Sequence, residues 1–302
     1  MKLNQLRDLM AIVERGSLRA AARHLNLPQP SLTRSLQALE KDLGAPLFER
    51  ESKGMVLTPI GQLFHQRASA VLNELQRARE EVEQIRGKMH GTLSIGLSFA
   101  LLAGLLPQVL SPFRLRFPDV KINVIEGAFP AVEAALRDRS VDFYAGPAPM
   151  QPPGQGFNYE PLFHNSRTVV CRRSHPCAHA RSLRDLNDQE WAVTSLDYNA
   201  TEDLERLFLR HGLAKPRVMM QSLSVFSVML TVASSDLLAI LPMQWSTTLI
   251  ASDALTAIEV EENLDAPDIV LISRSDLPLT PAAEYFCDLL RRSIPRDRAI
   301  SG

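Results

Sequence analysis

Side chains that can read the edges of DNA bases are concentrated between residues 29 and 37 of this 302-residue chain. Arginine pairs with guanine, and glutamine pairs with adenine, through two hydrogen bonds each. The segment holds Gln29, Pro30, Ser31, Thr33, Arg34 and Gln37. Four arginines and no acidic residue lie between Arg15 and Leu39, and a basic stripe suits a polyanion. The segment therefore indicates contact with DNA, with a plain solvated helix face as the alternative.

Three short helices would position these side chains, over residues 4–15, 18–25 and 29–43. The third helix carries an inward-facing stripe of leucines at helical spacing: Leu32, Leu36, Leu39 and Leu43. Arg34 lies about 200° around this helix from Leu32 and so faces outward. Asn26 precedes the third helix and tolerates the left-handed backbone conformation of a tight turn. The pattern is typical of a helix-turn-helix, whose second helix enters the major groove.

A β-hairpin is expected directly after these helices. Residues 48–50 and 55–57 read as short strands, with Lys53 and Gly54 at the tip. Such a hairpin would place Arg50 and Lys53 beside the phosphate backbone. Phosphate contacts position a protein on DNA without specifying sequence.

The stretch "LMAIVERGSLRAAARHLNLPQPSLTRSLQALEKDLGAPLFER" and the later "LTPIG" resemble the DNA-binding domain of LysR-type transcriptional regulators. The resemblance covers about the first 65 residues. It implies a winged helix-turn-helix domain over residues 1–58, which contacts DNA from the recognition helix through Gln29, Pro30, Ser31, Thr33 and Arg34, and from the wing through Arg50 and Lys53. Pro28 departs from the family, which usually has a serine-like helix cap at this position.

A long linker helix is expected over residues 59–90, with Thr58 as its cap, Pro59 at its first position and Gly91 after its end. Its apolar residues alternate spacings of four and three: Phe64, Ala68, Val71, Leu75, Ala78, Val82, Ile85 and Met89. This 3.5-residue repeat is typical of a coiled coil. We therefore expect a homodimer through this helix and a homotetramer as the larger assembly. A helix lying on its own domain is the alternative.

Strand and helix patterns alternate from Thr92 onward, which predicts an α/β fold with a parallel sheet. The family resemblance implies an effector-binding domain over residues 91–302, with two Rossmann-like subdomains similar to periplasmic binding proteins. Subdomain I would comprise residues 91–164 and 268–302, and subdomain II residues 165–267. The chain would cross between them near residues 164–167 and again near 266–269.

A cleft between the two subdomains is the expected effector site, because ligands of such folds bind at the carboxyl ends of strands. The candidate residues are Ser98, Phe99, Ala128, Phe129, Ser195, Tyr198, Ser222 and Ser224. Hydroxyl groups and aromatic rings, with a helix N-terminus after Ser98, suit a small organic acid, with an aromatic acid as one option. Each serine alone is better explained as a helix cap, so the prediction depends on their convergence.

Other chemistry finds little support in the sequence. Three cysteines give no disulfide framework, which favours a reducing cytoplasm. Cys171, His175, Cys177 and His179 lack the spacing of a standard zinc site, while a redox role for Cys171 and Cys177 stays open. Phosphate-binding loops, dinucleotide fingerprints and nucleophile elbows are all missing, so neither an enzyme nor a cofactor is expected. No signal-peptide pattern or membrane-length apolar run is present.

These patterns together predict a cytoplasmic, sequence-specific transcription regulator. Its partners would be double-stranded operator DNA and RNA polymerase, and a small organic effector would control it. One alternative is a cytoplasmic small-molecule-binding protein without direct DNA regulation. The other is an enzyme that uses the α/β cleft.

Overall fold

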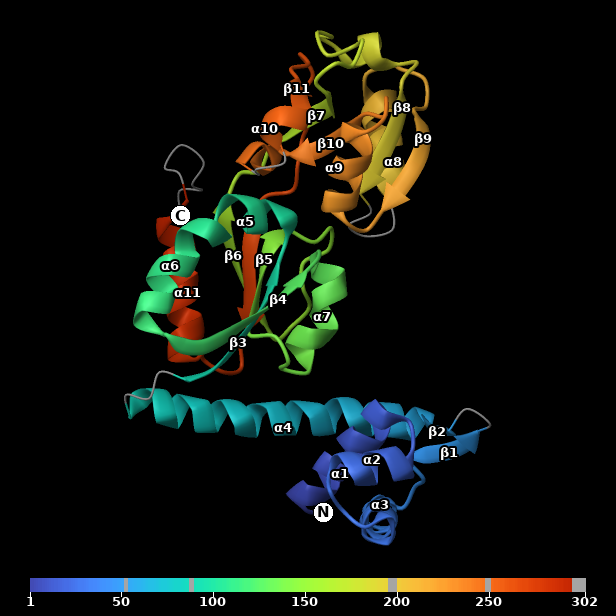
Figure 1. The fold of residues 1–302 in the computed structure, drawn as a ribbon, viewed down its shortest axis with the longest axis vertical. Helices are drawn as coiled ribbons and strands as arrows, with labels where there is room; N and C mark the ends of the chain where they lie inside the picture. Colours follow the sequence, from blue (N-terminus) through green and yellow to red (C-terminus); the bar gives the residue numbers. More distant parts are fainter. Residues whose placement is uncertain (52–53, 87–89, 195–199, 248–250, 295–302) are drawn as a thin grey trace. The chain divides into compact units, whose positions relative to one another are not determined.

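A computed structural model of the chain describes residues 1–51, 54–86, 90–194, 200–247 and 251–294 (Figure 1). They form two compact units, the first comprising residues 1–88 with the short segment 137–140, and the second comprising the remainder of residues 89–302. None of the described helices combines the length and apolar character that crossing a bilayer requires.

Three helices form the core of the first unit: α1 (Leu3–Arg15), α2 (Leu18–His24) and α3 (Gln29–Leu43). Ser17 caps α2, because its Oγ accepts a hydrogen bond from the Ala20 N–H at 3.2 Å. Asn26 adopts a left-handed backbone with φ 53°, as the tight turn requires. The three helices thus have the predicted helix-turn-helix arrangement.

The leucine stripe of α3 is shorter than predicted. Leu32, Leu36 and Leu39 are buried, but Leu43 is 38% exposed. The reason is that α3 ends at Leu43 and the chain turns at Gly44, whose φ is 69°. The fully buried Leu47 then enters the same core.

The wing consists of β1 (Phe48–Glu51) and β2 (Gly54–Leu57), which pair antiparallel from Phe48↔Leu57 to Glu51↔Gly54. The Met55 N–H donates to the Gly16 carbonyl oxygen at 2.9 Å, which fastens β2 to the turn between α1 and α2. The predicted hairpin is therefore present, and the tip residue Lys53 lies outside the described residues.

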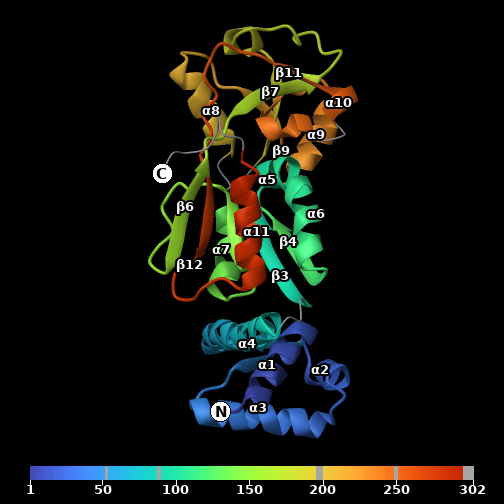
Figure 2. The ribbon, with the colours of Figure 1, turned by 90° about the vertical axis from the view of Figure 1, so that its left-hand side faces the viewer.

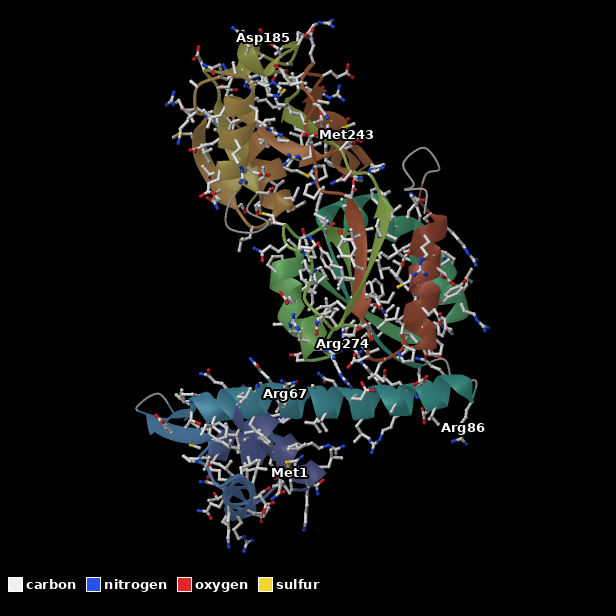
Figure 3. All side chains as sticks on the ribbon, turned by 180° about the vertical axis from the view of Figure 1, so that it is seen from behind. Met1, Arg67, Arg86, Asp185, Met243 and Arg274 are labelled. Carbon is white, nitrogen blue, oxygen red and sulfur yellow. The ribbon has the colours of Figure 1, made fainter. Side chains whose placement is uncertain are left out.

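Helix α4 (Pro59–Ile85) follows the wing and begins as predicted. The Thr58 Oγ1 accepts the Gly61 N–H at 2.9 Å. The helix ends at Ile85, earlier than predicted, and Gly91 lies inside the next strand, where it pairs with Val120. Figure 3 marks Arg67 in the first half of α4 and Arg86 at its end.

The apolar repeat of α4 is divided between two uses. Ala68 is 2% exposed and belongs to the core of the first unit, with Phe64 packed against the same core. Val71 and Val82 are 53% and 55% exposed. The beginning of the predicted seam therefore packs on its own domain, while Val71, Ala78 and Val82 in its later part are exposed.

The first lobe of the second unit is built on a five-stranded sheet in the order β4-β3-β5-β12-β6. These strands are β3 (His90–Leu97), β4 (Asp119–Glu126), β5 (Phe143–Pro147), β6 (Phe157–Phe163) and β12 (Ile269–Arg274). β3 runs parallel to β4 and β5, but β12 runs antiparallel to β5 and β6. The predicted parallel arrangement holds for β3, β4 and β5, while β12 adds an antiparallel strand because the chain re-enters this lobe in the opposite direction.

Helices cover both faces of this sheet (Figures 1 and 2). α6 (Leu106–Arg116) and α11 (Pro281–Arg292) pack on one face, and α7 (Phe129–Arg137) packs on the other. The short helix α5 (Phe99–Gly104) follows β3. Alternation along β5 explains the layers, because Phe143 and Ala145 face α6 and α11 while Tyr144 faces α7.

The second lobe contains an antiparallel group β10-β7-β11 and a parallel pair β8-β9. Its strands are β7 (Arg167–Arg172), β8 (Glu190–Thr194), β9 (Arg217–Ser222), β10 (Ala239–Pro242) and β11 (Leu255–Ile258). Its helices and 3-10 turns are η1 (Leu183–Leu186), α8 (Ala200–Arg210), α9 (Val225–Ala233), η2 (Met243–Thr247) and α10 (Ala251–Ala254). Helix α8 covers one face of the strands in this lobe, and helix α9 covers the opposite face.

Two segments connect the lobes, one from β6 to β7 and the other from β11 to β12. They meet at an isolated antiparallel bridge between Ser166 and Asp265.

Candidate functional site

The outward face of α3 carries the side chains expected to read DNA. Gln29, Pro30, Arg34 and Gln37 are exposed, and Ser31 and Thr33 are half-buried. The Thr33 Oγ1 donates to the Gln29 carbonyl oxygen at 3.0 Å, and the Arg34 Nη2 lies 3.4 Å from the Ser31 Oγ. Helix α3 thus presents a continuous polar face opposite its buried leucines.

A buried carboxylate holds α3 against α1. Asp8 is 8% exposed, and its Oδ2 accepts a hydrogen bond from the Ser35 Oγ. Asp8 was not identified from the sequence, although an acidic residue among the inward-facing positions of α1 is a recognisable signal of a buried polar contact. Because this bond joins the two helices, it helps to set the orientation of the polar face.

The wing residues are placed only in part. Arg50 lies in β1 opposite Met55, and its side chain is not described. Lys53 lies outside the described residues. Their contact with phosphate therefore stays a prediction.

A cavity of about 190 Å³ lies between the lobes of the second unit. Four predicted effector residues line it: Ser98, Phe99, Ala128 and Phe129. Ser98 is 3% exposed at the end of β3, and Phe99 packs against the core of the second lobe. The cavity walls also include apolar residues of the second lobe: Val193, Leu204, Leu207, Val225 and Ile240.

The other four predicted residues are not brought to this cavity by the described structure. Ser195 and Tyr198 lie outside the described residues. The Ser222 Oγ accepts the Ser224 N–H at 3.1 Å, and the Ser224 Oγ caps α9 by accepting the Ser227 N–H at 3.3 Å. Neither serine is among the residues that line the cavity. Both hydroxyl groups serve local turns, which is the helix-cap alternative of the sequence analysis.

Charged and amide side chains that the sequence analysis missed also line the cavity: Asn165, Arg167, Asp203 and Arg206. The Arg167 Nη2 donates to the Asp265 carbonyl oxygen, and its Nη1 lies 3.6 Å from the Asp203 Oδ2. Burial lowers the pKa of Arg167, and nearby Asp203 opposes this effect. One signal was present in the sequence, since Arg167 opens a strand with an apolar centre next to a predicted crossing.

The side chains of the described ranges form no group of three or more His, Cys, Asp or Glu residues able to hold a metal ion. Burial raises the pKa of the Cys171 thiol to about 11. The cleft is instead an apolar cavity with a few polar groups, a composition typical of small-molecule sites.

Comparison with known domains decides the family. Residues 86–295 match the LysR substrate binding domain. The chain belongs to the LysR family. Residues 3–62 of this LysR-family protein match the family's bacterial regulatory helix-turn-helix domain. The protein is therefore a DNA-binding transcription regulator with an effector-binding domain, and it is not an enzyme.

Individual relatives match between about three quarters and nearly all of the regulator. It is 23% identical to the transcriptional regulator TdcA of Escherichia coli K12 over 290 residues, or 96% of this chain and 92% of TdcA. It is 30% identical to BenM of Acinetobacter baylyi over 225 residues, or 72% and 73% of the two chains. The structure of full-length CbnR complexed with its target DNA has a TM-score of 0.74, with 22% identity over 97% of this chain and 100% of CbnR. The likeness to CbnR shows the shared fold.

Proposed function

We propose that this LysR-family regulator reads its operator with Gln29, Pro30, Ser31, Thr33, Arg34 and Gln37 on α3, while Arg50 and Lys53 of the wing contact phosphate. The observation that carries the proposal is the two-sided character of α3. Its leucines fill the core of the first unit, while its polar residues point away from that core. A helix N-terminus rich in polar side chains fits the major groove.

We further propose that α4 joins two copies into a homodimer, and that two dimers form a homotetramer. The exposed Val71 and Val82 support this proposal, because both belong to the 3.5-residue apolar repeat. A dimer would present two recognition helices to two half-sites, which suits palindromic DNA. The functional divisions would then be residues 1–58 for DNA, α4 for assembly, and the second unit for the effector.

The cavity between the lobes is proposed to bind a small organic acid that changes the DNA-bound assembly. Apolar walls with a few polar groups support a small ligand, and Ser98, Phe99, Ala128 and Phe129 would contact it. A ligand shifts such an assembly only through its different affinity for the two arrangements. We propose the cytoplasm as the place of action, with RNA polymerase as a further partner at the promoter.

Electrophoretic mobility shifts with DNA from upstream of the regulator's own gene test the reading surface. Arg34→Ala should weaken specific binding by about 1–3 kcal/mol, because a bidentate arginine contributes about that much discrimination between bases. Lys53→Ala should weaken binding to all DNA and reduce the salt dependence by about one phosphate contact.

Arg114→Ala is the matched control, since it removes an exposed arginine from α6 of the second unit. It should leave the affinity for the operator unchanged. Normal operator binding by Arg34→Ala would show that α3 does not read the sequence.

A further inference from the structure

Three buried polar atoms in the walls of the cleft have no hydrogen-bond partner among the described residues. They are the Ser98 Oγ, the Asn165 Oδ1 and the Arg167 Nε. The large majority of buried side-chain polar atoms in proteins are paired, so three unpaired atoms around one cavity point to a ligand that supplies partners. A ligand that meets both a hydroxyl and a guanidinium group must carry hydrogen-bond acceptors.

Arg167 has a weakly held counter-ion. Its side chain is 24% exposed, and its Nη1 lies 3.6 Å from the Asp203 carboxylate, which is long for a hydrogen bond. The Asp203 Oδ1 instead lies 2.9 Å from the Arg206 Nη2. Arg167 is thus a largely buried cation that shares its counter-ion with a second arginine.

Two carboxylates are shared among three arginines around this position. Arg167, Arg206 and Arg210 face the carboxylates of Asp203 and Asp265, and Arg210 lies 3.4 Å from Asp265. A buried charge that is incompletely compensated is unfavourable, and an added anion relieves this cost. The place for such an anion is beside the Arg167 Nε, which has no partner in the described part of the chain.

We propose that a carboxylate group of the effector binds Arg167, Ser98 and Asn165, and that it displaces Asp203 as the counter-ion of Arg167. This inference rests on the proposed effector function of the cleft. Asn165 contributes after its amide rotates by half a turn, which presents Nδ2–H in place of Oδ1. Asp203 keeps Arg206 as its partner.

The remainder of the ligand lies against apolar walls. Phe99, Leu204, Leu207 and Val225 surround the cavity, whose volume is about 190 Å³. The ligand class is therefore a small monocarboxylic acid with an apolar body.

The exchange also couples binding to the arrangement of the lobes. The Arg167–Asp203 pair lies within the second lobe, whereas Ser98 belongs to the first lobe. A carboxylate held by both Ser98 and Arg167 replaces an interaction within one lobe by an interaction between lobes. Such binding requires Ser98 and Arg167 to line the same cavity, so the acid favours the arrangement of the lobes in which they do, which is the differential affinity that regulation requires.

Calorimetric titration of the full-length chain tests the exchange. The probes are butyrate, benzoate and phenylacetate, each compared with its neutral amide. At least one acid should bind, and its amide should bind about tenfold more weakly or worse, because a hydrogen bond to a charged group contributes that much. Arg167→Gln should weaken acid binding by a similar factor. Asp203→Asn should tighten it severalfold, a gain that misfolding does not produce.

The opposite end of β7 offers matched controls. The Arg172 side chain is 27% exposed, and its Nη2 lies 2.6 Å from the Asp236 Oδ1. Neither residue is among those lining the cavity. Arg172→Gln and Asp236→Asn should leave acid binding unchanged. Circular dichroism and operator binding report whether each variant is folded.

Three outcomes would overturn the inference: no acid binds, amides bind as tightly as acids, or Asp203→Asn weakens acid binding. If amides bind the wild-type chain and change its operator affinity, the effector function stands and only the carboxylate exchange fails. If operator binding is unaffected by every bound probe, the proposed regulation through the cleft fails instead.

Discussion

The Glu40 Oε1 near the end of α3 accepts the backbone N–H of Leu47 at 2.8 Å. The same oxygen lies 3.4 Å from the Phe48 backbone nitrogen, at the first residue of the wing. One side chain thus fixes the start of the wing relative to the proposed recognition helix. The two elements would contact the duplex together, so their relative placement matters for affinity.

Removing this carboxylate should therefore affect both stability and DNA binding. Glu40→Ala leaves the Leu47 N–H without its acceptor, which should lower the free energy of unfolding by about 1–3 kcal/mol. Urea unfolding measures this change, and mobility shifts should show weaker operator binding. Glu40→Gln keeps an acceptor oxygen and should lose much less. Equal behaviour of the Ala and Gln variants would argue against the contact.

Gly61 should not tolerate a side chain. A Cβ at this position would overlap the Leu47 carbonyl oxygen, which is backbone and has little freedom to move. Gly61→Ala should lower the free energy of unfolding by about 1–3 kcal/mol, as overpacking commonly does. The neighbouring Gln62→Ala, at an exposed position of the same helix, should be nearly neutral. A melting temperature of Gly61→Ala equal to that of the wild type would contradict the close approach.

Val82→Asp should weaken dimerisation through α4. Val82 is 55% exposed, and a partner helix on this side would bury the introduced carboxylate in an apolar seam. Sedimentation velocity should show a shift toward monomers. Gln76→Asp places the same carboxylate about 120° away around the helix and should leave the assembly intact. An unchanged dimer in Val82→Asp would favour the alternative of a helix that lies on its own domain.

Alkylation should distinguish the three cysteines of the native regulator. Burial raises the pKa of the Cys171 thiol to about 11 and also raises the pKa of the Cys287 thiol. A raised pKa leaves less thiolate at a given pH, and thiolate is the form that reacts. Iodoacetamide at pH 8 should therefore modify the partly exposed Cys177 first.

Mass spectrometry of the labelled chain measures the site of alkylation. Cys177→Ser should remove the fast reaction, and urea should make the remaining thiols reactive. Rapid labelling of Cys171 in the folded chain would contradict the prediction and show that strand β7 opens readily.

Much of the fold was predictable because it depends on local patterns. Leucine spacing located α3, and Thr58 with Pro59 located the start of α4. The pattern failed, or left the direction of a strand open, where position in the fold decides. Leu43 fits the leucine stripe but lies beyond the core, and β12 reads as an ordinary strand although it runs antiparallel. A pattern gives the type of an element and leaves its direction open.

The cleft was harder to predict than the fold. Ser98 was found because it directly follows a strand and precedes a helix, which is a local rule. Arg167 and Asp203 come together from β7 and α8, and nothing in their own neighbourhoods indicates this pairing. Ser222 and Ser224 fit the local rule as well, yet their hydroxyl groups serve the start of α9.

The burial of Ala68 in the core of the first unit has a mechanical consequence. Because the first turns of α4 are part of the same core as α1 and α3, the helix-turn-helix domain (the head) and helix α4 (the arm) form one rigid body without a hinge between them. A rotation of one arm against its partner would turn the attached head through the same angle. The spacing of half-sites that two heads can span would then be set by how the arms cross, and a small change in crossing would be magnified along the DNA.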